Sequence, residues 1–153
     1  MERIARAFLI ATGLLYTILL FYAYAYFADL SYVRLKLAGE FFQISSNTFF
    51  YTGLIIPMIT SIICVILGYL LKKQQVGAQF YFKNEKAQQT LYSWSISLGG
   101  AFHLFYASLL TIIIFVNNEE GLQQSGYVPL LLGSLAVIAF WIIWLPLILR
   151  KNK

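Results

Sequence analysis

The chain has 153 residues, of which 60% are hydrophobic and only 11% are charged, and its formal net charge is +5. Soluble domains usually have about half apolar and a quarter charged residues, so this composition argues against a soluble fold. The length leaves room for several membrane spans of ~20 residues, but not for a soluble domain of ~50 residues as well. We attribute the positive charge to membrane topology and expect no nucleic-acid partner.

The first apolar segment, 7–28, directly follows two arginines, Arg3 and Arg6. As a helix it would extend about 33 Å, which is enough to cross a hydrocarbon core of about 30 Å. It is longer than the ~7 to 15 apolar residues of a signal peptide, and it ends in clustered aromatic residues that suit a membrane interface. We therefore interpret it as a retained first span.

The first connector, 29–48, has two interpretations. Apolar residues recur in it at helical spacing, at Leu30, Val33, Leu37, Phe41 and Ile44. This spacing predicts a short helix that lies in the membrane interface. The alternative is a short strand, because residues 33–37 alternate between apolar and charged side chains. We favour the interfacial helix.

The second apolar segment, 49–71, has its small or helix-bending residues on one face. They fall three or four positions apart, at Gly53, Pro57, Ser61, Cys64 and Gly68. Small residues let helices approach closely in lipid, so we expect this face to pack against another span. Pro57 removes an intrahelical hydrogen bond, and the carbonyl that it frees needs another partner. Cys64 is the only cysteine, so the chain forms no internal disulfide.

The second connector, 72–90, is basic, with four lysines against one acidic residue. The lysines are Lys72, Lys73, Lys83 and Lys86. Basic residues beside a membrane attract anionic lipid headgroups or an acidic partner surface, which makes these lysines candidate contact residues. A positively charged cytoplasmic loop is the simpler interpretation.

The third apolar segment, 91–116, is rich in small and hydroxyl residues and contains the only histidine, His103. Its small residues, among them Ser97, Gly100 and Ser108, predict a central helix that packs against the small face of the second span. His103 beside Gly99 and Gly100 is a candidate haem or quinone contact, since imidazole ligates haem iron and glycines admit a planar ring. One histidine supplies one ligand, so we favour a structural, hydrogen-bonded His103.

The third connector, 117–126, contains no Lys or Arg, and the last apolar segment, 127–149, precedes a basic end. Nine of the 11 Lys and Arg residues lie at the two ends of the chain or in the second connector. This asymmetry predicts four spans with both termini in the cytoplasm. We expect one all-α domain, 1–153. Its connectors are short, so adjacent spans should pack as an antiparallel four-helix bundle. We expect this bundle to lie in the bacterial inner (plasma) membrane.

The predicted function is that of a non-catalytic accessory or assembly subunit in a larger membrane complex. Its partners would be membrane lipids and other integral membrane subunits. No Asp, Glu, Lys or Arg lies deep in a predicted span, and such residues usually mark ion-coupled pumps and carriers. No catalytic or metal-binding motif occurs, and no cofactor is predicted outside the His103 alternative.

Two alternatives stay open. The first is a redox subunit that contacts haem or quinone through His103. The second is a homo-oligomeric channel or carrier for a small neutral or lipidic molecule, with the bent span around Pro57 beside its path. No sequence motif selects a known family.

Overall fold

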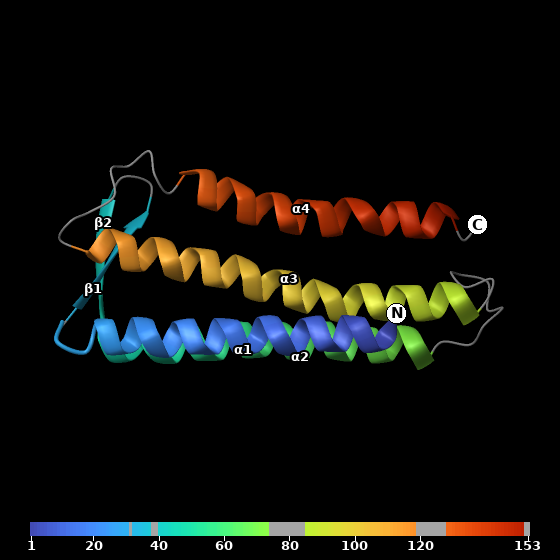
Figure 1. Ribbon diagram of the computed structural model, residues 1–153, viewed down its shortest axis with the longest axis horizontal. Coiled ribbons are helices and arrows are strands. Elements are labelled where there is room, and N and C mark those ends of the chain that lie inside the picture. Colours follow the sequence, from blue (N-terminus) through green and yellow to red (C-terminus); the bar gives the residue numbers. More distant parts are fainter. Residues whose placement is uncertain (31, 38–39, 74–84, 119–127, 152–153) are drawn as a thin grey trace.

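The computed structural model describes residues 1–30, 32–37, 40–73, 85–118 and 128–151 (Figure 1). Its elements are α1 (Glu2–Tyr26), β1 (Tyr32–Leu37), β2 (Glu40–Ser45), α2 (Ser46–Lys73), α3 (Glu85–Asn117) and α4 (Val128–Lys151). The described chain is mostly helical, and four of its helices are long and apolar enough to cross a membrane. The prediction of four such helices is therefore confirmed.

Two helices begin well before the apolar segments that predict them. α1 begins at Glu2 and α3 begins at Glu85. The first residues of α3, 85–89, are mostly charged or polar and have good helix propensity, so they extend the helix past the end of its apolar stretch. An apolar window marks the part of a helix that suits hydrocarbon, and it leaves out such polar extensions.

The helices run alternately in opposite directions, with α3 between the others (Figure 1). α3 packs against α1, α2 and α4, whereas α4 packs mainly against α3. α1 and α2 contact each other far less than either contacts α3. The third helix therefore holds the described part of the molecule together.

The interfacial helix predicted for the first connector is wrong. β1 and β2 form an antiparallel hairpin in which Val33 lies opposite Ile44 and Arg34 lies opposite Gln43. Pairing satisfies the backbone groups that the two strands share. The period-two alternation puts Val33, Leu35 and Ile44 in contact with the buried core, and Val33 is fully buried. A lone helix lying on the surface would satisfy its backbone equally well, but the hairpin closes over the end of the core.

The main core lies at the hairpin end of the helices. Its buried residues are Tyr16, Leu20, Ala23, Phe27, Val33, Phe49 and Leu110. A smaller cluster at the other end joins the start of α1 to α3 through Ala5, Tyr92 and Ile96. Outside these clusters many large apolar side chains of α2 and α4 are exposed, such as Ile63 and Ile143. Side chains of this kind suit contact with lipid.

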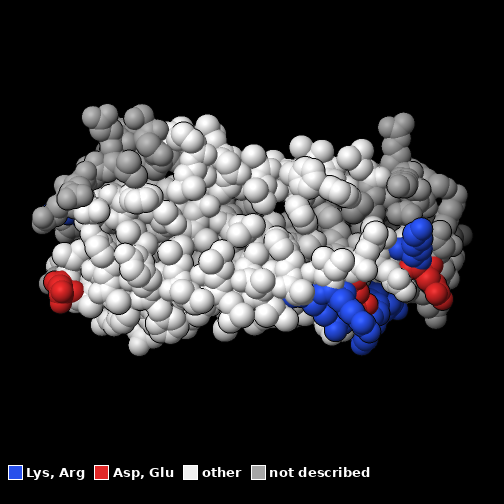
Figure 2. Space-filling model, in the orientation of Figure 1, with Lys and Arg blue, Asp and Glu red and all other residues white. Residues whose placement is uncertain are grey.

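Charged residues lie at the ends of the helices. On the face that Figure 2 shows, Lys and Arg gather at the end where α1 begins, and the long middle is uncharged. Charges are costly in hydrocarbon, so this distribution suits helices that cross an apolar layer.

Candidate functional site

His103 lies in the interior of the helical assembly, where α1, α2 and α3 meet. Its Nε2 is 2.8 Å from the hydroxyl oxygen of Ser61 on α2. Its ring lies against Gly13 of α1, where an added Cβ would be only 3.1 Å from Cε1. The ring also stacks on Tyr16, with centroids 6.2 Å apart. His103 therefore contacts both neighbouring helices, and only 8% of it is exposed.

The tautomer of His103 depends on Ser61. The Ser61 hydroxyl lies 2.8 Å from the Pro57 carbonyl oxygen as well, and a hydroxyl has one proton to donate. When that proton goes to Pro57, the His103 Nε2–H donates to Ser61 and Nδ1 becomes an acceptor. Nδ1 is buried without a hydrogen-bond partner among the described residues, and an added Cβ at Gly13 of α1 would lie 3.4 Å from it. The second nitrogen thus faces α1.

Side chains of α1 cover the two glycines beside His103. An added Cβ at Gly99 would lie 3.0 Å from Leu9 Cδ1, and one at Gly100 would lie 2.5 Å from Phe8 Cδ1. The glycine surface that would receive a planar ring is therefore occupied by side chains of α1.

The small face of α2 contacts two different helices. An added Cβ at Gly53 would meet Leu20 of α1 at 2.8 Å, and one at Gly68 would meet Ile96 of α3 at 3.3 Å. Cys64 lies between these glycines, buried against Gly99. Its carbonyl oxygen accepts a hydrogen bond of 2.8 Å from the Ser95 hydroxyl. These contacts give Cys64 a packing position rather than a reactive one.

Tyr16 supplies the hydrogen bond that Pro57 removes from α2. Proline has no N–H, so the carbonyl four residues earlier, that of Gly53, loses its helical partner. The Tyr16 hydroxyl donates to that oxygen at 2.6 Å. The sequence pattern of the first span does not mark Tyr16. The one signal is Pro57 itself, which requires a donor from another helix.

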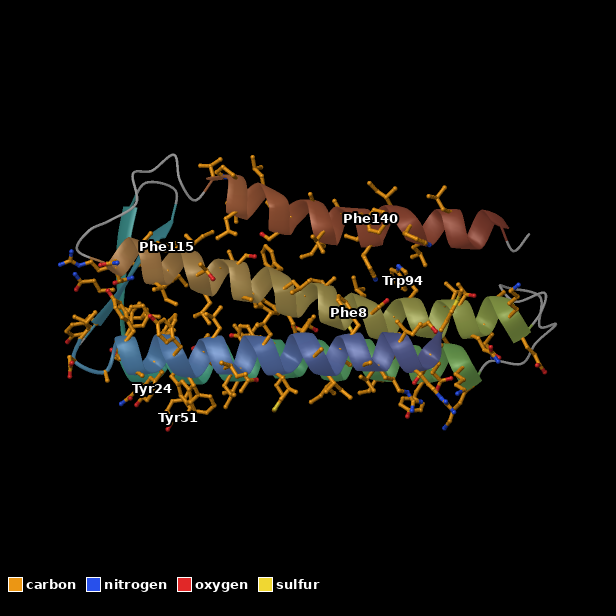
Figure 3. All side chains as sticks on the ribbon, in the orientation of Figure 1. Phe8, Tyr24, Tyr51, Trp94, Phe115 and Phe140 are labelled. Atoms are coloured by element: carbon orange, nitrogen blue, oxygen red, sulfur yellow. The ribbon has the colours of Figure 1, made fainter. Side chains whose placement is uncertain are left out.

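Two tryptophans form hydrogen bonds between α3 and α4. The Trp94 Nε1–H donates to the Trp141 carbonyl oxygen at 2.9 Å, and the Trp141 Nε1–H donates to the Ser97 hydroxyl at 3.0 Å. Figure 3 shows Trp94 on the side of α3 that faces α4. Ser97 therefore contacts α4, whereas the Ser108 hydroxyl bonds to the Leu104 carbonyl of its own helix.

The candidate lysines differ in what they contact. The Lys72 Nζ lies 3.3 Å from Glu2, which also pairs with Arg6, and it lies 5.0 Å from the ring centre of Tyr92. Lys73 and Lys86 are exposed and form no ion pair with a described residue. Lys83 lies outside the described residues.

Within the described ranges, no three or more His, Cys, Asp or Glu side chains are grouped so that they could hold a metal ion.

Comparison with protein-family models, with curated proteins and with solved structures finds no match to this chain. The fold defines a class: a mostly helical protein with four helices long and apolar enough to cross a membrane.

Proposed function

We propose that this chain is an integral membrane protein of the bacterial inner membrane and acts as a non-catalytic accessory or assembly subunit. Its four helices form an antiparallel bundle, and the basic end, where α1 begins, faces the cytoplasm. The Lys and Arg residues gathered at that end support this orientation.

The outer face of α4 is the observation that carries the proposal. Ser134 is buried, whereas Gly133 and Ala136 are exposed. An added Cβ at Gly133 would meet no atom within 4 Å. Lipid covers large apolar side chains well, but exposed glycine and alanine one turn apart allow another helix backbone to approach closely. We infer that a transmembrane helix of another subunit packs there.

The polar groups inside the described helices support a non-catalytic role. Ser61 and His103 bond to each other, Ser95 bonds to the Cys64 carbonyl, and Tyr16 bonds to the Gly53 carbonyl. Each of these contacts joins two helices. Residues engaged in this way are used for assembly, and a substrate would have to displace them.

The test is purification in a mild detergent, followed by identification of the chains that purify with this one. We expect Gly133→Leu and Ala136→Leu to reduce recovery of the partner at least tenfold. Leucine is a good helix former, so these changes leave α4 helical. Ala11→Leu is the matched control, because Ala11 is also small and exposed but lies on α1.

A stable homo-oligomer with no other chain would contradict the accessory role and favour the channel or carrier. Pro57 lines a cavity of about 250 Å³ between α1, α2 and α3, beneath Leu35 and Ile44 of the hairpin. Its walls are almost wholly apolar, which suits a lipidic cargo better than an ion.

A further inference from the structure

Two adjoining cavities lie at the end of the molecule where α1 begins. One is an apolar cleft of about 450 Å³ and the other is a basic recess of about 840 Å³. Met1, Ile4, Thr90 and Ser93 line both. Each volume falls within the ~300–1,000 Å³ that is usual for small-molecule sites. Together they offer one amphipathic site.

The apolar cleft lies between α1, α3 and α4. It exists because the backbone of α4 lies close to that of α3 alone among the described elements, which leaves space beside α1. Across that space Phe8 stacks on Trp141, with ring centroids 6.2 Å apart. The indole N–H groups of Trp94 and Trp141 are already hydrogen-bonded. The rings therefore offer the cleft their apolar surfaces.

The basic recess has unpaired positive charge. Its one acidic side chain, Glu2, pairs with Arg6 and with Lys72. Arg6 also donates to the Tyr92 hydroxyl at 2.9 Å. Arg3 and Lys86 line the recess as well, and neither forms an ion pair with a described residue. These two cations are available to an anionic ligand.

Ser93 connects the two cavities. It is only 8% exposed, and its hydroxyl oxygen is buried without a hydrogen-bond partner in the described structure. A buried hydroxyl without a partner carries a free-energy cost, so rotation of the Ser93 side chain toward a ligand in either cavity would be favourable. Ser93 lies where the basic recess meets the apolar cleft.

We propose that this site binds one anionic phospholipid. The phosphate lies between Arg3 and Lys86 and accepts a hydrogen bond from Ser93, and an acyl chain occupies the cleft beside the three tryptophans. Basic pockets between helices at the cytoplasmic side are suited to such headgroups, and indole rings are suited to the same depth. The inference rests on the membrane location in the proposed function, but not on a partner subunit.

Tryptophan fluorescence tests the site directly, because all three tryptophans of the chain line the cleft. The full chain is reconstituted in phosphatidylcholine vesicles that contain a small fraction of phosphatidylglycerol. Bromine, a quencher, is placed on the acyl chains of the phosphatidylglycerol or of an equal fraction of phosphatidylcholine. We expect brominated phosphatidylglycerol to quench the fluorescence more strongly than brominated phosphatidylcholine at the same mole fraction.

Substitutions at the named residues test whether they cause the preference for phosphatidylglycerol over phosphatidylcholine. Arg3→Gln and Lys86→Gln should each weaken this preference about fivefold, as expected for one lost charge at a membrane surface. Ser93→Ala should weaken it about tenfold, as for a lost hydrogen bond to a charged group. Lys73→Gln is the matched control, since Lys73 is basic and exposed but lines neither cavity.

Equal quenching by the two lipids would overturn the inference and leave the membrane location intact. An equal loss in Lys73→Gln and Lys86→Gln would also overturn it, because general surface charge would then explain the preference. Quenching by neither lipid would contradict both the site and the membrane location of the proposed function.

Discussion

Single polar residues inside the helices need partners from the protein, because hydrocarbon offers no hydrogen bonds. Tyr16 illustrates this need best. Its hydroxyl donates a hydrogen bond to the Gly53 carbonyl oxygen, which lacks a helical donor because residue 57 is a proline. The proline in α2 and the tyrosine in α1 thus form one functional pair, although they lie on different helices.

We expect Tyr16→Phe to destabilise the protein by about 1 kcal/mol, because the Gly53 carbonyl is left without a donor. In a Pro57→Ala background, Tyr16→Phe should lower the free energy of unfolding much less, since the alanine restores the helical N–H. Unfolding in mixed micelles of mild detergent and dodecyl sulfate measures both values.

Tyr22→Phe is the control for this pair, because Tyr22 is exposed and its hydroxyl has no hydrogen bond to a described residue. It should leave the unfolding free energy unchanged. Equal costs of Tyr16→Phe with and without Pro57 would mean that the hydroxyl does not compensate for the proline.

Sequence reasoning finds some of these residues and misses others for a physical reason. The stripe of small residues on α2 is visible because it repeats at helical spacing, and the lone His103 is visible because it is polar in an apolar run. Tyr16 belongs to no repeat, and the serines that recur in the third segment do not distinguish Ser93 or Ser95. Their roles depend on which atom of another helix lies opposite, and one sequence does not contain that information.

At the scale of whole elements, one side chain of α3, Asn117, forms hydrogen bonds to the backbone of the hairpin. The Asn117 amide accepts a hydrogen bond from the Arg34 N–H and donates one to the Arg34 carbonyl, both at 2.8 Å. Its amide group therefore imitates a neighbouring strand along the edge of β1, and so satisfies part of an edge that would otherwise be free.

We expect Asn117→Ala to speed hydrogen exchange at the Arg34 amide roughly tenfold, because that amide loses its protein acceptor. Exchange followed by mass spectrometry of peptides covering β1 measures the effect. Asn47→Ala, which alters an exposed asparagine just after β2, should leave that rate unchanged. Unchanged exchange in Asn117→Ala would show that other contacts dock the hairpin.

The hairpin also shows where periodicity misleads. Five apolar residues of the first connector fit a helical spacing, and part of the same stretch fits an alternating one. The choice depends on whether a second segment is available to pair, and β2 provides it. Local patterns determine the long helices more firmly than this short element, since over a short stretch the two periods overlap.

At the scale of the whole molecule, the proposed orientation is open to chemical labelling. We expect Asn47→Cys to react with a membrane-impermeant maleimide in intact cells, and Lys73→Cys to react only after the membrane is opened. These exposed residues lie at opposite ends of α2. The unaltered chain is the control, because Cys64 is buried. The reverse pattern would place both termini outside.

The central position of α3 has a consequence for biosynthesis. α1 and α2 leave the ribosome first, yet they contact each other far less than they contact α3. In a membrane, the first two helices would therefore remain loosely associated until the third has been inserted. Translation of α3 then becomes the step that commits the nascent chain to its native fold, and α4 is added to a core already assembled.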